Sequence, residues 1–60
     1  MEVCWLLEIS VDGRAAWYVS ENKFTHDANL AMKCDSKETA KNYMLENHIS
    51  NCITLEHVFC

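Results

Sequence analysis

Hydrophobic and polar residues alternate near the start of the chain, in the pattern of a half-buried strand. A second run of aromatic and β-branched residues, 15–20, follows across Asp12-Gly13. The two runs together predict a β-hairpin. In the first run, one face holds Val3, Trp5, Leu7 and Ile9, and the other holds Cys4, Leu6, Glu8 and Ser10.

The length of the hairpin loop decides which side chains share a face, because directly opposed residues do so. A two-residue loop at Asp12-Gly13 places Trp17 opposite Glu8 and divides the large apolar residues between the two faces. A three-residue loop over 11–13 places Trp17 opposite Leu7, and its glycine takes the left-handed position of a type I turn with a G1 bulge. The pattern therefore predicts the three-residue loop.

The middle of the chain predicts a connection followed by a short strand. Residues 20–29 are polar apart from Phe24, and Thr25 can cap a short helical turn that ends at Leu30. The next four residues, Ala31 to Cys34, predict a third strand with Met32 directed inward.

A helix is predicted from Ser36 to about Asn47. Its cap is Asp35 or Ser36, and Asp35 with Glu38 has the spacing of a capping box. Leu45 lies outside its narrow apolar stripe, which consists of Ala40, Tyr43, Met44 and Asn47.

The chain ends in a further strand, so its elements define a fold class. After a loop at 47–51, the last strand is indicated by the alternation of Ile53, Leu55, His57 and Phe59. We expect a single α+β domain over residues 1–60, with a small antiparallel sheet made of the β-hairpin, the short third strand and the C-terminal strand, and with one α-helix packed on one face. A chain of this length buries only about 60% of the surface that its unfolded form exposes. That leaves no room for a deep enzyme cleft.

Composition and charge narrow the class of partner. Half of the residues are hydrophobic, with no proline and one glycine, so the chain is expected to fold. Its net charge of -4 has the wrong sign for a protein that neutralises phosphates, and nucleic acid is a disfavoured partner. The only basic row is Lys33, Lys37 and Lys41.

No membrane span or secretion signal is recognised in the sequence. No segment approaches the roughly 20 apolar residues that a span needs. The apolar first eleven residues are interrupted by Glu2 and Glu8, and they lack a basic start and a cleavage site. We therefore expect no membrane partner, an intracellular location, and free thiols at the four cysteines.

The last quarter of the chain invites a zinc site, which strand geometry disfavours. Cys52 and His57 are an odd number of residues apart, so they point to opposite faces of a strand, and Cys60 lies roughly 26 Å from Cys52 along it. The remaining candidate ligand is His48. We expect no metal and no cofactor. An enzyme is also not expected, since one glycine hardly supplies an oxyanion pocket for a Cys-His pair.

Six short segments of the chain carry a resemblance to a known family: Trp5 to Glu8, Asp12-Gly13, Trp17-Tyr18, Phe24 to Ala31, Ser36 to Ala40 and Glu56 to Phe59. Their motifs resemble those of small bacteriophage and prophage accessory proteins of the lambdoid type. Members generally carry no assigned activity, so the resemblance implies origin and fold more than function. An aromatic residue is usual in that family where this chain has Cys34, which implies a looser core at that strand end.

The predicted register leaves apolar residues on the sheet face that the helix does not cover. There, Leu6 lies opposite Tyr18 and forms a contiguous patch. We expect a phage-encoded accessory protein that binds a host or phage protein in the host cytoplasm. Self-association of two copies through the same sheet face would give a homodimer. The alternative is a nucleic-acid-associated regulator of phage development. The candidate interaction surface is Cys4, Leu6, Tyr18, Leu45 and Val58.

Overall fold

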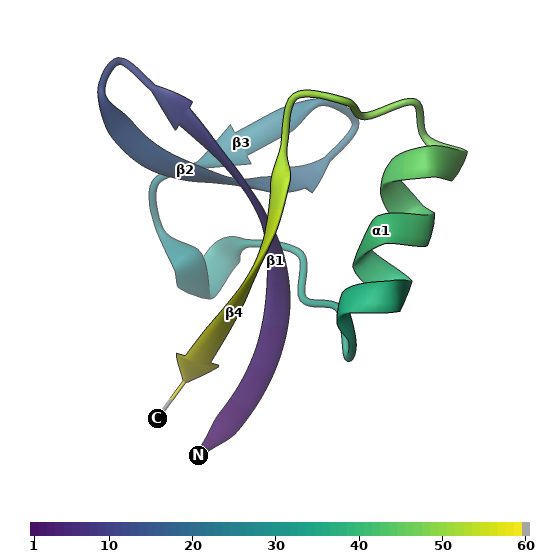
Figure 1. The fold of residues 1–60 in the computed structure, drawn as a ribbon. Coiled ribbons are helices and arrows are strands. Elements are labelled where there is room, and N and C mark those ends of the chain that lie inside the picture. Colours follow the sequence, from purple (N-terminus) through teal and green to yellow (C-terminus); the bar gives the residue numbers. More distant parts are fainter. Residues whose placement is uncertain (60) are drawn as a thin grey trace.

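A four-stranded antiparallel sheet with one α-helix on one face forms the fold, which confirms the predicted α+β class (Figure 1). The computed structural model describes residues 1–59. The sheet has the strand order β3-β2-β1-β4, so β1 is central and β4 is an edge. The elements are β1 (Glu2–Val11), β2 (Arg14–Ser20), β3 (Lys23–Thr25), the 3-10 helix η1 (Ala28–Leu30), α1 (Lys37–Glu46) and β4 (Ile53–Phe59).

The β1–β2 loop has two residues, so the predicted three-residue loop is wrong. Val11 pairs with Arg14 and Glu8 pairs with Trp17, which leaves only Asp12 and Gly13 in the turn. Both turn residues have positive φ, at 53° and 77°. Two successive positive φ angles define a type I′ turn, whose twist matches that of the strands and which favours Asp-Gly.

This register exchanges the faces of β2 relative to the prediction. Trp17 shares a face with Glu8 and Leu6, while Tyr18 shares a face with Leu7 and Trp5. The three-residue loop set Trp17 opposite Leu7, on the face of Trp5, whereas the structure places the two tryptophans on opposite faces of the sheet.

The third strand is Lys23–Thr25, so the prediction of a strand at 31–34 is also wrong. The 31–34 segment instead lies where β1 and β2 separate. The Met32 N–H donates to the Tyr18 carbonyl at 3.0 Å, and Cys34 exchanges two backbone hydrogen bonds with Trp5, at 2.8 and 2.9 Å. Only one isolated bridge of the predicted strand forms, because the segment connects two diverging strands.

The helix bounds agree with the prediction, and the caps differ in detail. Ser36 is the N-cap of α1 and accepts from the Thr39 N–H at 3.1 Å, so the Asp35–Glu38 capping box is not the arrangement used. Asp27 caps η1, where Thr25 was expected to do so. The Thr25 hydroxyl instead accepts from the Asp27 N–H at 3.0 Å.

The main core lies between α1 and the sheet. Met32 packs against it, as predicted, and Leu45 lies outside it. The connection that contains η1 runs on the opposite side of β1 (Figure 1). Both faces of β1 are thereby covered near its middle, and Leu6 and Leu7 are its two fully buried large side chains. The core cluster consists of Leu7, Tyr18, Cys34, Ala40 and Cys52.

Candidate interaction edge

Three of the five predicted surface residues are buried. Leu6 is 0% exposed, Tyr18 is 3% exposed, and Cys4 is also buried. The premise that these three side chains are exposed is therefore wrong. Tyr18 lies on the helix side because of the two-residue loop, and its ring makes edge contacts with Phe24 and Tyr43 at centroid distances of 5.6 and 5.7 Å.

The other two predicted surface residues are exposed. Leu45 is 76% exposed on the outer side of α1, and Val58 lies half exposed on β4. The structure thus does not bring the five residues together into one surface. It leaves Val58 on a strand that has further exposed apolar side chains.

Strand β4 forms a free edge of the sheet. It pairs with β1 from Glu2↔Phe59 to Glu8↔Ile53, and the strand order ends there. Figure 1 looks onto this edge: β4 passes in front of β1, and β2 and β3 are drawn fainter behind them. With seven residues, β4 is longer than the three-residue β3 at the opposite edge. Long, unprotected edge strands are templates for pairing with another strand.

The hydrogen bonds of Trp5 identify which backbone groups of β4 are free. In an antiparallel pair, the N–H and C=O of one residue point to the same side. Trp5 directs both groups at Cys34, away from β4, so its pair with Glu56 is not hydrogen-bonded. The N–H and C=O groups of Thr54, Glu56 and Val58 therefore point out from the free edge.

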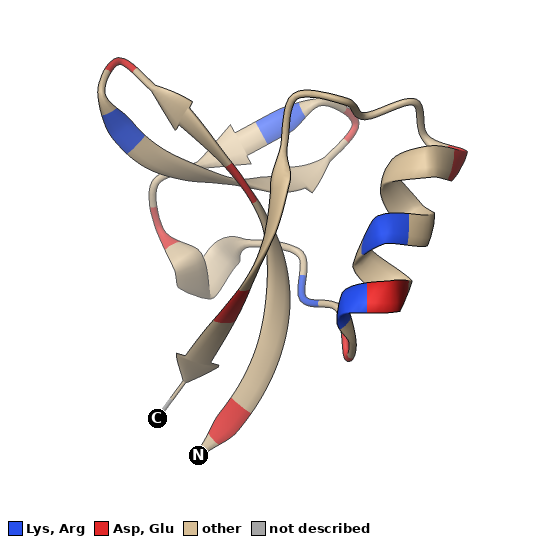
Figure 2. Cartoon of the chain, in the orientation of Figure 1, with Lys and Arg blue, Asp and Glu red and all other residues tan. Residues whose placement is uncertain are grey.

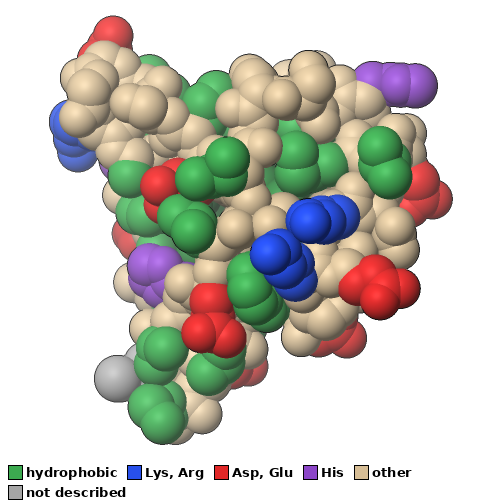
Figure 3. All heavy atoms as spheres, in the orientation of Figure 1, with side chains coloured by type: hydrophobic (Ala, Val, Ile, Leu, Met, Phe, Trp, Pro, Cys, Tyr) green, Lys and Arg blue, Asp and Glu red, His purple; other side chains and the backbone are tan. Residues whose placement is uncertain are grey.

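Apolar side chains flank this edge on both faces. Ile53 is 58% exposed and Leu55 is 41% exposed, on the face away from α1, and Val58 lies on the opposite face. Hydrophobic side chains gather around the front strand in the space-filling view (Figure 3). The prediction missed Ile53 and Leu55. The sequence feature that could have indicated their exposure lies in β1. This strand has apolar residues on both faces, which is typical of a central strand, and a central β1 leaves the last strand at an edge of the sheet.

A row of ring systems fixes the surface beside Leu55. The Trp17 indole donates to Glu8 Oε1 at 3.0 Å and meets the His57 ring edge-on at 5.7 Å. His57 in turn lies 4.8 Å from Phe59, measured between ring centroids. These contacts place the three rings side by side on the face of the sheet that carries Leu55.

A groove of about 320 Å³ lies between α1 and the start of β4. Two lysines of α1 line it, and they lie next to each other beside the front strand in Figure 3. Figure 2 shows that basic and acidic positions are otherwise mixed over the fold. The groove is lined by Lys37, Lys41, Met44, Cys52, Ile53 and Thr54.

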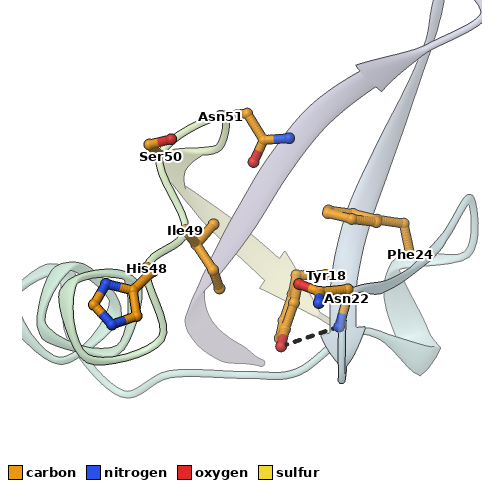
Figure 4. A pocket seen from close by; sticks show the side chains of 7 residues that line it. All are labelled: Tyr18, Asn22, Phe24, His48, Ile49, Ser50 and Asn51. Carbon is orange, nitrogen blue, oxygen red and sulfur yellow. Dashed lines mark hydrogen bonds between the residues drawn. The ribbon is translucent and has the colours of Figure 1, made fainter.

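A second hollow of about 380 Å³ lies between the β2–β3 turn and the loop after α1 (Figure 4). Asn22 donates its backbone N–H to the Tyr18 hydroxyl at 3.4 Å at its floor. The lining side chains carry amide, hydroxyl, aromatic and imidazole groups and the aliphatic chain of Ile49, with no carboxylate or thiol among them.

The thiols and imidazoles do not gather into a site within residues 1–59. Cys4, Cys34 and Cys52 are free and buried, and burial raises the pKa of the Cys34 and Cys52 thiols. No group of three potential metal ligands lies close together in that part of the chain. Cys60, the last candidate zinc ligand, falls outside the described residues. None of the helices formed by the described residues has the length and apolar character to cross a membrane.

Comparison with known proteins adds no family to this description. No protein-family model, curated protein or solved structure is significantly similar to the chain. The functional interpretation therefore rests on the geometry of the β4 edge and on the motifs of the sequence.

Proposed function

We propose that this chain is a small phage-encoded accessory protein that binds another protein through the β4 edge and has no catalysis of its own. The partner class is a host or phage protein in the host cytoplasm. The phage origin rests on the resemblance of the strand and helix-start motifs. The mode of action rests on β4.

The observation that carries the proposal is the combination of free backbone groups and apolar side chains on one strand. Natural edge strands are usually blunted by charge, proline or a covering element. In β4 the only formally charged side chain is Glu56, and Ile53, Leu55 and Val58 are all exposed. Strand addition uses these two features together, because the backbone supplies affinity and alternate side chains supply specificity.

A nucleic-acid-associated regulator is the second candidate, and Lys33, Lys37 and Lys41 are what favours it. Two of these side chains already lie on aromatic rings. The Lys33 ammonium is 4.8 Å from the Phe59 ring centroid, and the Lys37 ammonium is 5.9 Å from that of Trp5. With a net charge of -4, this surface is weaker support than the β4 edge.

The test compares the protein with two variants of matched chemistry. Leu55→Lys places a charge on the exposed edge, and Leu45→Lys places the same charge on the exposed side of α1. We expect affinity capture from host lysate to lose its specific partner with Leu55→Lys and to keep it with Leu45→Lys, while both variants retain the far-UV spectrum. Loss with Leu45→Lys alone would move the interface to the helix. A mobility shift of DNA or RNA abolished by Lys37→Glu would favour the regulator.

A further inference from the structure

The β4 edge is matched to β4 of a second copy of this chain. Resting on the proposed function of that edge, we propose that two copies pair their β4 strands antiparallel about a twofold axis at Leu55. The pairing joins two four-stranded sheets into one. Backbone direction, charge and apolar contact together select this register, and each can be evaluated from the structure of one copy.

The direction of the backbone groups limits which residues can face each other. Directly opposed residues in an antiparallel pair either both direct their backbone groups across the pair or both direct them away. Since Thr54, Glu56 and Val58 carry the free groups, these residues must oppose one another. Three registers have the twofold axis near the middle of β4. They place Glu56 opposite Thr54, opposite Glu56 or opposite Val58 of the second copy.

Charge distinguishes the three registers from one another. The self-opposed register brings two Glu56 carboxylates face to face, which is destabilising. The register with Val58 puts a carboxylate against an apolar side chain and brings two copies of His57 together. In the register with Thr54, Glu56 of the second copy arrives on the face that carries α1, because opposed residues share a face.

The residues beside Thr54 complement that carboxylate. Lys37 and Lys41 line the groove to which Thr54 contributes. Glu56 of each copy therefore approaches the lysines of the other, and the twofold axis makes this contact twice. Each copy carries a net charge of -4, so a register that places carboxylates beside lysines is favoured over one that brings carboxylates together.

Apolar side chains meet on the face of the sheet away from α1. There the same register sets Leu55 against Leu55 of the second copy, and Ile53 against the second copy's His57. Both leucines and both isoleucines are partly exposed in the single copy. Their burial adds apolar area to a domain that is small enough to gain from self-association.

Cross-linking tests the register. The Leu55 pair lies at a non-hydrogen-bonded position, where opposed Cα atoms are about 4.5 Å apart, within the range that a disulfide spans. With Cys60 replaced by Ser in every chain, Leu55→Cys should form a covalent dimer on mild oxidation. The matched control Ile53→Cys should not, because its two copies lie roughly 14 Å apart along the strand. Cross-linking by Glu56→Cys or His57→Cys in place of Leu55→Cys would overturn the register.

Charge exchange tests the contact by a second route. Sedimentation of the full chain should show a concentration-dependent dimer. Its dissociation constant should rise roughly tenfold in Glu56→Lys and in the double variant Lys37→Glu with Lys41→Glu, because two exposed contacts are lost. Combining all three changes should restore it. A dimer that responds to none of these variants overturns the proposal.

The outcome also separates this inference from the function on which it rests. A chain that stays monomeric, yet loses its captured partner with Leu55→Lys, overturns the pairing of two copies and leaves β4 as the binding edge for an extended segment of another protein. A dimer and a captured partner that are both unchanged by Leu55→Lys overturn both.

Discussion

Trp17 lies directly opposite Glu8 in the hairpin, and its indole Nε1 donates a hydrogen bond to the Glu8 carboxylate at 3.0 Å. A rule that sets apolar residues opposite apolar residues rejects this pair, because it treats tryptophan as a hydrocarbon. The indole N–H is a donor that needs a partner when the ring is partly buried. The contact is thus one reason that the two-residue register is stable.

Removing the indole donor should destabilise the hairpin. Trp17→Phe keeps an aromatic ring and leaves the carboxylate without this partner, so we expect a loss of about 1 kcal/mol in the free energy of unfolding, measured by urea denaturation. Glu8→Gln retains an acceptor oxygen and should cost less. Equal losses in the two variants, or an additive double variant, would show that the hydrogen bond does not stabilise the fold.

The turn predicts a second contrast, between its two residues. Gly13→Val should cost well over about 1 kcal/mol, since a β-branched residue tolerates positive φ poorly. A Cβ at Gly13 meets no atom within 4 Å, so the cost comes from the backbone and not from a clash. Asp12→Asn should be nearly neutral, because asparagine accepts the left-handed conformation. Thermal melts of the two variants give the comparison.

Burial predicts opposite outcomes for two leucines. Leu6→Ala should cost about 2 to 5 kcal/mol, because Leu6 is fully buried in spite of its position on the face away from α1. Leu45→Ala should stay within about 0.5 kcal/mol, as expected for an exposed side chain. Denaturant midpoints of both variants decide the matter. A neutral Leu6→Ala would mean that the η1 connection does not cover that face.

The buried thiols predict a pH dependence of stability. Burial raises the pKa of Cys34 and Cys52 above the ordinary value of 9.0, so the unfolded chain loses these protons first. The free energy of unfolding should therefore be unaffected by these thiols at neutral pH, and should fall as the pH rises through about 9 toward their folded pKa. Urea midpoints at several pH values measure the slope, and Cys52→Ala should reduce it.

The melting temperature should not respond to dithiothreitol, since Cys4, Cys34 and Cys52 form no disulfide with one another.

Much of the fold follows from local pattern. Alternation located β1 and β4, a run of aromatic and β-branched residues located β2, and the polar start of α1 placed its first turn within a residue. Strand β3 escaped prediction because it is three residues long with one large apolar side chain, Phe24. The turn before it holds Glu21 and Asn22 at positive φ. Glutamate is an unusual residue in that conformation, so the sequence carries only a weak turn signal there.

The candidate site was harder to predict, because exposure depends on tertiary contacts. The connection that contains η1 runs on the side of β1 away from α1 (Figure 1), Leu6 on that side is fully buried, and Ala31 within the connection is buried as well. No hydrophobic pattern indicates such a cover. The exposure of Leu45 was predictable because it depends only on the position of that residue around one helix.

The pairing of β1 with β4 has a consequence for synthesis of the chain on the ribosome. β1 is made first, but its partner along Glu2–Glu8 is the last of the described strands to emerge. Until then, the nascent chain presents the outer edge of β1 as an open ladder beside Leu6 and Leu7. Contacts between such distant segments slow folding, and open ladders are aggregation-prone. When β4 docks, it pairs with the open side of β1 and becomes the last strand of the sheet, so closure of the fold moves the free edge from β1 to β4 without removing it.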